Sequence, residues 1–364
     1  MDYGRGLIVS IAKSEKALME LSSDGKKILF VDSVKKIYRF LPGNEQIFPE
    51  PSAAALLDRI AEFDVVEFYS DSNFKVLFRD DSNDNALVVT NQCNSNCIMC
   101  PCSEGARRRP SRETAEHLCQ ILEYIPTDIR YLTITGGEPT LLGNSLFPVL
   151  QKLQEHFEDF TQFQFLTNGR AFSDPDYFRQ FMAAVPDRVH YGIPLYGYSA
   201  ETHDSITQVD GSFAQTVSGI RALLHRSCQV ELRIVISKLN QSHMDELAGF
   251  IASNFQGVTH VAVMAAEMCG AAAANRQDVW IDYQEAFQAS KNAIKILLSG
   301  GIDVMLFNFP LCKVERGYWA LCKKSISDYK IRYYETCQSC KVRDLCGGVF
   351  RSTLRLTGMK LDPI

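Results

Sequence analysis

The sequence lacks a basic excess, a long apolar run and any internal repeat. Its 38 Lys and Arg residues are outnumbered by 43 Asp and Glu residues, giving a formal net charge of -5. Such a chain offers no overall positive field to a nucleic acid or to an anionic membrane surface. The absence of repeats and low-complexity tracts argues against a repeat architecture.

No amino-terminal segment has the form of a secretory signal. The run "LIVSIA" (residues 7–12) is too short for one, and the charged "KSEK" (residues 13–16) follows it directly. The longest weakly polar run, "VAVMAAEMCGAAAA" (residues 261–274), contains Glu267 and is shorter than a bilayer span. We therefore expect no membrane association and a cytoplasmic location.

Twelve cysteines are present, and in a reducing compartment they are not expected to form disulfides. Three of them stand alone and are expected to be small buried hydrophobes: Cys119, Cys228 and Cys269. The other nine fall into an early group, at 93–102, and a late group, at 312–346. Clustered thiols in a cytosolic protein indicate metal binding.

The order of the segments predicts the fold. From residue 85 onward, six short β-rich runs alternate with helical runs, beginning with "ALVVT", "YLTIT" and "FQFLT". This alternation predicts an α/β fold, a partial (β/α)6 TIM-like barrel over residues 85–300, with its chemistry at the carboxyl ends of the strands. The length of 364 residues leaves room for smaller attached parts.

Two attachments are predicted. Residues 1–84 contain four strand-like runs around the helix-like "PSAAALLDRIAEF", which indicates a small α+β module. Residues 301–364 hold the late cysteines and are predicted to form a cysteine-rich extension.

The early cysteines have a distinctive spacing. Cys93, Cys97 and Cys100 form C-x3-C-x2-C, which matches neither the paired knuckles of zinc sites nor the spacing of two-cluster ferredoxins. Three thiolates on one loop can hold three irons of a cubane and leave the fourth iron open for a ligand. Spacing alone favours an iron–sulfur site and leaves zinc or chance as alternatives.

Further motifs follow the next strands. "GGEP" comes after the second predicted strand, "LTNG" after the third, and "IPLYGYSAETHDSIT" covers the fourth. With the cysteine motif, they give residues 85–270 a specific resemblance to the radical S-adenosylmethionine (SAM) enzymes. Two positions depart from the family pattern: Met99 replaces a common aromatic residue, and Pro194 replaces a serine that can contact the SAM ribose.

The resemblance implies a mechanism and a set of site residues. A [4Fe–4S] cluster on Cys93, Cys97 and Cys100 would bind SAM at its open iron, and reductive cleavage would give a 5'-deoxyadenosyl radical that abstracts a substrate hydrogen. Cofactor contacts are expected from the "GGEP" and "LTNG" motifs: Gly136, Gly137, Glu138, Pro139, Thr167 and Asn168.

Two neighbouring features are given structural interpretations. Cys102 is expected to be a free thiol, because a fourth protein ligand would displace SAM. The run "ARRRPSR" (residues 106–112) is expected to be a solvated loop, with a secondary role in steering an acidic substrate segment.

The late cysteines have the spacing C-x9-C followed by C-x2-C-x5-C. Zinc is the alternative on spacing alone. After a radical SAM core, this pattern resembles the auxiliary-cluster extensions called SPASM or Twitch domains. A full SPASM pattern has seven cysteines and this tail has five, with Phe350 near the place of another, so one auxiliary [4Fe–4S] cluster is expected. Its predicted ligands are Cys312, Cys337, Cys340 and Cys346, with Cys322 as the alternate.

Three functions are considered. The motif phrases resemble the radical SAM maturases of the His-Xaa-Ser peptide system, which implies a ribosomally synthesised precursor peptide as substrate. An electron donor such as flavodoxin or ferredoxin, and a partner maturase, are further implied partners. The alternatives are a radical SAM enzyme acting on a small metabolite or nucleotide, and a non-catalytic metal–sulfur protein.

Overall fold

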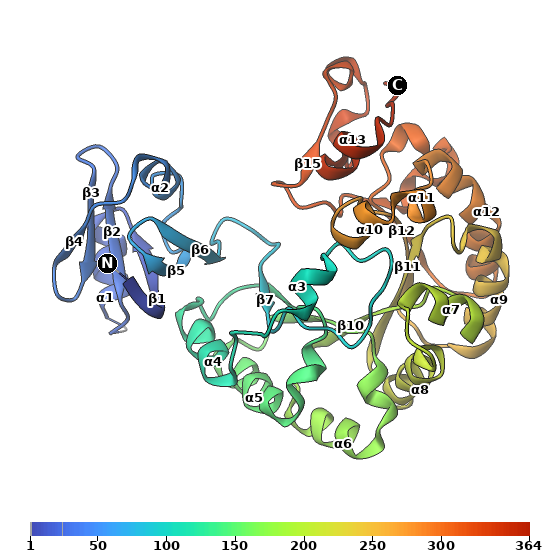
Figure 1. The fold of residues 1–364 in the computed structure, drawn as a ribbon, viewed down its shortest axis with the longest axis horizontal. Coiled ribbons are helices and arrows are strands. Elements are labelled where there is room, and N and C mark those ends of the chain that lie inside the picture. The colour runs from blue at the N-terminus through green and yellow to red at the C-terminus, as the bar shows by residue number, and fades with distance from the viewer. Residues whose placement is uncertain (1, 24) are drawn as a thin grey trace.

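Three sheets organise the chain. A computed structural model describes residues 2–23 and 25–364, and their strands form sheets of six, eight and two strands. In Figure 1 the six-stranded sheet lies at one side, the curved eight-stranded sheet forms the body, and the carboxyl-terminal segment lies over one end of that body. None of the described helices has the length and apolar character needed to cross a bilayer.

The amino-terminal module, residues 2–78, contains more elements than the sequence predicts. Its sheet has the order β4-β3-β2-β1-β5-β6. The elements are β1 (Asp2–Ala12), α1 (Glu15–Ser22), β2 (Ile28–Asp32), β3 (Ile37–Leu41), β4 (Glu45–Ile47), α2 (Pro51–Leu57), β5 (Val65–Ser70) and β6 (Asn73–Phe78). The four predicted strands and the helix are present. The elements α1, β3 and β4 were not predicted from the sequence, although α1 and β3 are no shorter than the predicted α2 and β2.

The module's sheet contributes to two apolar cores. Alternate residues of a strand point to opposite faces. Val9 and Ile11 of β1 pack with Phe68 in a core of the module itself, whereas Ile8 belongs to the core of the large sheet. Apolar packing therefore joins the module to the rest of the protein.

The eight-stranded sheet is parallel throughout, and its order follows the chain. Its strands are β7 (Ala86–Val88), β8 (Tyr131–Thr135), β9 (Gln162–Leu166), β10 (Val189–Pro194), β11 (Gln229–Ile236), β12 (His260–Ala265), β13 (Val304–Phe307) and β14 (Cys322–Lys323). The predicted α/β fold with a curved parallel sheet is confirmed. The last two strands were missed, because four and two residues are too short to show a pattern.

Helices cover the convex face of this sheet. They are α4 (Ala115–Tyr124), α5 (Phe147–His156), α6 (Pro175–Ala184), α7 (Ala200–Thr207), α8 (Ser212–His225), α9 (Met244–Asn254) and α12 (Tyr283–Ser299), and shorter turns lie between them: α3 (Glu104–Arg108), η1 (Pro139–Leu146), η2 (Arg170–Ser173), η3 (Gln241–His243), α10 (Gly270–Ala274) and α11 (Arg276–Val279). Each strand turns one set of residues to the helices, such as Tyr191, Leu232 and Val261, which are buried in the main core. The alternate residues face the concave side, where the chemistry of such folds lies.

The remaining chain forms the tail, residues 308–364, apart from the strand β14. Its elements are η4 (Leu311–Lys313), η5 (Arg316–Leu321), β15 (Ile331–Arg332), η6 (Glu335–Ser339), η7 (Arg343–Leu345), β16 (Val349–Phe350) and α13 (Arg351–Thr357). Because β13 and β14 pair with the large sheet, that sheet continues past the predicted division at residue 300. The limits of the domains stay predictions.

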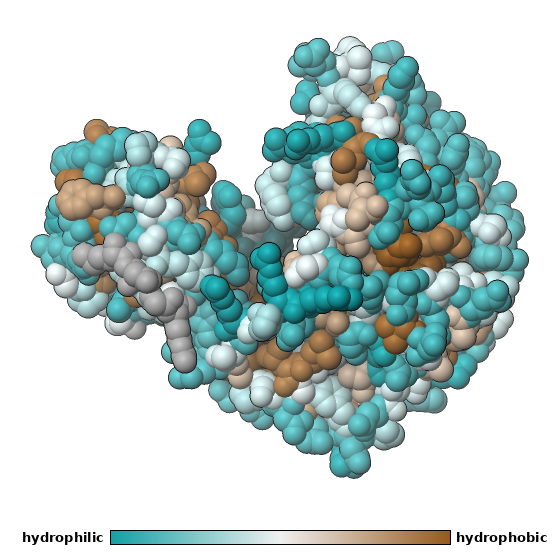
Figure 2. Space-filling view, viewed as in Figure 1, coloured by the Kyte–Doolittle hydropathy of each residue, from teal (hydrophilic) through white to brown (hydrophobic). Residues whose placement is uncertain are grey.

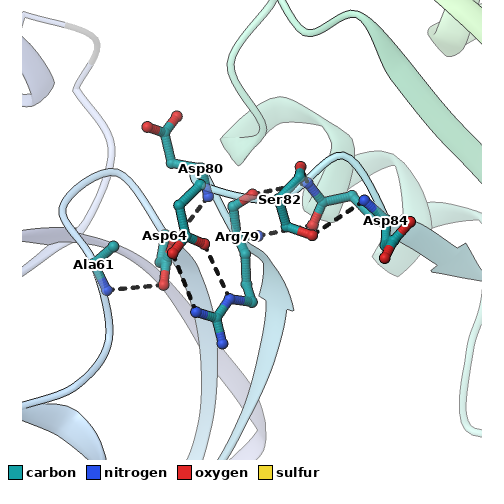
Figure 3. Close-up of polar contacts among 8 residues, drawn as sticks. Ala61, Asp64, Arg79, Asp80, Ser82 and Asp84 are labelled. Atoms are coloured by element: carbon teal, nitrogen blue, oxygen red, sulfur yellow. Dashed lines mark hydrogen bonds and ion pairs between the residues drawn. The ribbon is translucent and has the colours of Figure 1, made fainter. Parts of the chain in front are cut away.

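The linker between β6 and β7, residues 79–85, is fixed by hydrogen bonds (Figure 3). Asp64, which is 1% exposed, accepts a hydrogen bond from the backbone N–H of Asp80 at 2.8 Å. Asn85 accepts one from the N–H of Arg79 at 2.8 Å and donates to two backbone carbonyls. Local hydrogen bonds thus define how the module enters the barrel.

A histidine also joins the module to the barrel. His117 of α4 places Nε2 3.0 Å from Oε1 of Glu67 on β5, and its Nδ1 lies 2.6 Å from Oε2 of Glu113. Tyr69 donates to the other oxygen of Glu67 at 2.7 Å. The buried Glu67 therefore lies between the phenol of its own strand and the imidazole of a barrel helix.

We expect the free energy of unfolding to fall as pH rises from about 6.5 through about 9. The hydrogen bonds to Glu113 and then to Glu67 raise the pKa of His117 from 6.5 to about 9. Because the folded protein binds this proton more tightly, the proton adds at most about 3 kcal/mol to the free energy of unfolding. The full contribution is present below the pKa of His117 in the unfolded chain, and it is lost as pH rises through the pKa in the folded protein. Denaturant unfolding across this range measures it.

The matched variants are His117→Gln and His225→Gln, the second at an exposed position. His117→Gln should flatten the pH profile, and His225→Gln should leave it unchanged. A profile of His117→Gln as steep as that of the wild type would show that this junction does not bind the proton.

Candidate functional site

The cysteine loop, residues 91–102, begins three residues after β7, at the carboxyl edge of the large sheet, and its first cysteine is Cys93. Cys93, Cys97 and Cys100 are half-buried, and Cys102 is exposed. The backbone turns tightly there, since the N–H of Cys100 donates to the carbonyl of Cys97 at 3.1 Å. The N–H of Ser95 lies 3.4 Å from Sγ of Cys93, a contact suited to a thiolate.

Neighbouring segments hold the loop in place. The N–H groups of Asn96 and Ile98 donate to the carbonyls of Thr207 and Ile206, at 2.9 and 3.0 Å. Met99 is buried in an apolar cluster with Ile206 and Met268. Met99 therefore fills an apolar site against α7 where the family commonly has an aromatic residue.

The expectation of a solvated arginine run is wrong for Arg107. Its side chain is buried, and it donates to Oδ1 of Asn96 at 2.6 Å and to the carbonyl of Cys97 at 3.4 Å. Arg108 and Arg109 are exposed, as expected. Arg107 thus packs on the cysteine loop, and no pattern in the run predicts which of its arginines turns inward.

Burial and one hydrogen bond determine the protonation of the loop thiols. Burial raises the pKa of Cys93 to about 11 and that of Cys97 to about 12. A hydrogen bond from the thiol of Cys102 lowers the pKa of Cys100 to about 6. Cys93 and Cys97 are therefore neutral thiols near pH 7, and metal ions bound to these sulfurs would remove their protons.

The "GGEP" segment packs directly on the strand exit that leads to the cysteines. The N–H of Gly137 donates to the carbonyl of Thr90 at 2.7 Å. A Cβ on Gly136 would lie 2.3 Å from that same oxygen, and a Cβ on Gly137 would lie 2.2 Å from the carbonyl oxygen of Gln92. The two glycines are thus required by close approach of backbone to backbone inside the protein.

Glu138 is fully buried, and its carboxylate accepts four hydrogen bonds. Oε1 accepts from the backbone N–H of Thr140 at 3.0 Å and from the hydroxyls of Thr140 and Thr167 at 2.7 Å each. Oε2 accepts from the N–H of Asn168 at 2.7 Å. Burial raises the pKa of this carboxyl, and the hydrogen bonds oppose that shift. Glu138 therefore joins the turn that starts at Pro139 to the loop after β9.

The loop after β9 in turn reaches the cysteines. Nδ2 of Asn168 donates to Oδ1 of Asn94 at 2.7 Å. Arg170 donates to the carbonyl of Asn94 at 2.7 Å and to the hydroxyl of Ser95 at 3.1 Å. Three loops from three neighbouring strands thus form one hydrogen-bonded unit. Thr167 and Asn168, predicted as cofactor contacts, belong to this unit, and their contact with a cofactor stays a prediction. Asn94 and Arg170 were not predicted, although Arg170 directly follows the "TNG" motif.

The segment at 266–275, after β12, also lies on the cysteine loop. The N–H groups of Ala271 and Ala272 donate to the carbonyls of Cys102 and Cys100, at 3.3 and 3.2 Å. Gly270 has φ +56, and a Cβ there would lie 2.2 Å from the carbonyl oxygen of Pro101. Cys269, expected to be an isolated buried residue, instead donates its thiol to the same carbonyl at 3.1 Å.

The tail brings the four preferred late cysteines to the lining of one cavity. Its lining includes Cys312, Cys337, Cys340 and Cys346, together with Tyr333 and Arg343. Cys322 is absent from this lining and lies on β14, where burial raises its pKa to about 12.

Backbone N–H groups approach the sulfurs of this cavity. Those of Leu311 and Gly348 lie 3.5 and 3.4 Å from Sγ of Cys346. Burial raises the pKa of Cys312, and a hydrogen bond from the backbone of Asp362 opposes that shift. Such donors are typical around thiolates that bind iron–sulfur clusters.

No three His, Cys, Asp or Glu side chains within the described ranges converge as a ready site for a single metal ion. The four preferred tail cysteines line one cavity, and Cys93, Cys97 and Cys100 are half-buried on the loop after β7. Both donor sets consist of several thiols, the ligands that iron–sulfur clusters take.

Comparison with known proteins finds a matching family profile and several curated relatives. The profile of the Radical SAM superfamily matches residues 87–251. A mycofactocin maturase of Mycolicibacterium smegmatis is 26% identical over 220 residues, which is 60% of this chain and 52% of that protein. A probable GTP 3',8-cyclase of Archaeoglobus fulgidus is 28% identical over 189 residues, 50% of this chain and 59% of that protein. The chain thus spans about half the length of these curated relatives.

The fold has solved counterparts. The structure of native anSMEcpe with bound AdoMet and Cp18Cys peptide superposes with a TM-score of 0.52 at 13% identity, covering 73% of this chain and 88% of that chain. At this identity the likeness concerns the fold, and it agrees with the curved parallel sheet described above.

We expect Glu138→Gln to lower the free energy of unfolding by about 2 kcal/mol, because an amide group would face hydrogen-bond donors in a buried site. Equilibrium denaturation of the metal-free protein measures this loss. Glu155→Gln, at an exposed position of α5, is the control and should change little. Equal stability of the two variants would remove the structural role of the Glu138 carboxylate.

Proposed function

Residues 87–251 form a radical SAM domain, and on that premise we propose that the protein is a radical SAM enzyme that modifies a peptide. The observation that carries the first part is the hydrogen-bonded unit of three loops around Cys93, Cys97 and Cys100. A [4Fe–4S] cluster and SAM would together supply one chemical capacity: an electron passed to the sulfonium yields methionine and a 5'-deoxyadenosyl radical that abstracts a substrate hydrogen.

Residues of this chain would bind the cluster and SAM and fix their positions. Cys93, Cys97 and Cys100 would bind three irons, and Arg107 braces the loop that presents them. The backbone at Gly136 and Gly137 would offer carbonyls to the SAM amine, while the carboxylate of Glu138 is occupied by internal donors and acts on the position of that backbone.

The four tail cysteines support a second metal–sulfur site. They surround one cavity, and N–H groups approach the sulfur of Cys346. We propose an auxiliary [4Fe–4S] cluster of the Twitch or SPASM kind there, with Cys322 as the alternate ligand. Zinc is the competing occupant that the iron analysis below distinguishes.

A peptide is the proposed substrate. One of the relatives is a maturase, and the tail cysteines resemble the extensions found on peptide-modifying enzymes. The motif resemblance extends the proposal to the His-Xaa-Ser system, with flavodoxin or ferredoxin as electron donor and a second maturase as partner. A cytoplasmic location belongs to the proposal, because these thiols need a reducing compartment. The relative described as a GTP 3',8-cyclase supports the second candidate, a small metabolite or nucleotide as substrate.

The tail site gives a prediction on metal content. Anaerobic reconstitution should load about eight irons per chain, and Cys337→Ala with Cys340→Ala should lower this to about four. Cys228→Ala, at a lone half-buried cysteine, is the matched control and should retain the full content. Zinc in the tail, or about four irons in the intact protein, would contradict the auxiliary cluster.

The same double variant also tests the substrate. It should still release 5'-deoxyadenosine with SAM and dithionite, and it should fail to modify a candidate precursor peptide encoded nearby. Circular dichroism and SAM binding must be retained, because loss of a structural cluster can unfold a domain. Turnover of a nucleotide in place of any neighbouring peptide would support the second candidate.

The early cysteines give a separate prediction. Cys97→Ala should abolish formation of 5'-deoxyadenosine, whereas Cys102→Ala should largely preserve it, because the proposed open iron needs no fourth thiolate. Liquid chromatography of the quenched reaction measures the product. Equal loss in both variants would require a ligand or catalytic role for Cys102.

A further inference from the structure

A charged pair lies on the concave wall of the barrel, outside all the motifs considered so far. Arg233 of β11 donates through Nη1 to both carboxylate oxygens of Glu231, at 3.2 and 3.3 Å. Glu231 is 1% exposed, and its Oε2 accepts a further hydrogen bond from Gln164 of β9 at 3.0 Å. Burying two charges is costly, so a pair of this kind needs an explanation beyond stability.

The strand register sets the position of Arg233. It lies opposite Pro194 of β10 and Ala262 of β12, so the three residues share one level and one face of the sheet. A Cβ on Gly192 would lie 3.2 Å from Cδ of Arg233, which shows that the arginine extends across β10. Pro194 is the position where the radical SAM pattern has a residue facing the cofactor. Arg233 therefore lies beside the expected position of SAM.

The Nε–Nη2 edge of the Arg233 guanidinium is available to bind a ligand. Within residues 2–23 and 25–364, no hydrogen-bond partner of Arg233 Nε or Nη2 is found, while Nη1 is used by Glu231. The side chain is 21% exposed, although β11 is a central strand whose other face is covered by helices. This exposure must therefore be toward the concave side. The Nε–Nη2 edge has the two parallel donors that a carboxylate binds in a bidentate manner.

Arg233 is positively charged, whereas the two histidines near it are neutral. Burial lowers the pKa of His190 and of His260, so both imidazoles are neutral near pH 7. His260 Nε2 lies 3.8 Å from Oε1 of Glu231, and its ring centroid lies 5.6 Å from that of His190. Glu231 and Gln164 thus fix the arginine in one orientation, which reduces the entropy lost when a ligand is bound.

We propose that Arg233, oriented by Glu231, anchors a carboxylate inside the barrel. This inference rests on the proposed function, because the ligand is one that the radical reaction brings there. Two sources have the same chemistry: the methionyl carboxylate of SAM and a carboxylate of the substrate. Glu231 and Gln164 act through Arg233 and are positioning residues.

The first arm of the test uses SAM and decarboxylated SAM. Their affinities are measured anaerobically by equilibrium dialysis on cluster-loaded wild type, Arg233→Gln and Arg233→Lys. If the SAM carboxylate is the ligand, the preference for SAM over its decarboxylated form should shrink about tenfold or more in Arg233→Gln and less in Arg233→Lys.

The second arm uses succinate as a small carboxylate probe, with SAM present and absent. Phenylglyoxal labels accessible arginines, and mass spectrometry locates the label. If a substrate carboxylate is the ligand, succinate should protect Arg233, and the SAM preference should not differ between Arg233→Gln and wild type. An unchanged preference together with no protection would overturn the proposal and leave Arg233 as the structural partner of Glu231.

Folding needs its own control, because Arg233→Gln leaves Glu231 buried without its partner. The double variant Glu231→Gln with Arg233→Gln removes both charges and should have the iron content and thermal unfolding of the wild type. Like Arg233→Gln, it should lose the preference for SAM over decarboxylated SAM if the SAM carboxylate is the ligand. It should lose protection by succinate if a substrate carboxylate is the ligand. The proposed function is tested separately by release of 5'-deoxyadenosine from the wild type. If the wild type released no 5'-deoxyadenosine, the proposed function would fail, and the succinate experiment would still test whether Arg233 binds a carboxylate.

Discussion

The buried carboxylate of Glu138 is the interaction on which the arrangement of the three loops depends. It receives donors from its own turn and from the loop after the neighbouring strand. The second loop then holds Asn94 through Asn168 and Arg170. An isolated carboxylate would be costly in this dry position, and four short hydrogen bonds offset that cost. The Glu138 carboxylate therefore positions the cysteine loop through internal hydrogen bonds, without needing to contact the cofactor.

Close backbone contact is the second constraint. Gly136, Gly137 and Gly270 each lie where a Cβ would meet a backbone oxygen at 2.3 Å or less. Two of these contacts are on the strand exit that leads to the cysteines, and the third is on Pro101 within the loop. Backbone atoms on both sides cannot move aside as a flexible side chain can, so each position excludes every residue except glycine.

Much of this site could be predicted from the sequence. The strand order was predicted from the alternating segments, and the close spacing of three thiols predicts an iron–sulfur site. The tail cysteines that line the cavity are the four that were preferred, and three of them have the local spacing C-x2-C-x5-C. Contacts between distant segments carried no such signal. The inward turn of Arg107, the contact of Cys269 with Pro101 and the pairing of Arg233 with Glu231 depend on loop paths and strand register. Short β13 and β14 were missed for lack of length.

The segment after β12 connects the two cysteine sites. Ala271 and Ala272 donate to the carbonyls of Cys102 and Cys100 at one end of this segment. At the other end, the N–H of Met268 donates to the hydroxyl of Thr353 on α13 at 3.0 Å.

An ion pair strengthens this connection, since Lys330 of the tail lies 3.1 Å from the carboxylate of Glu267. Figure 1 shows the tail lying over the end of the barrel where β12 and α10 are found. A few residues thus contact the loop of the first site and the helix of the tail at once. A displacement of this segment would change both sites together, because rigid packed segments transmit shifts to whatever they contact. This segment therefore links the position of the cysteine loop to that of α13.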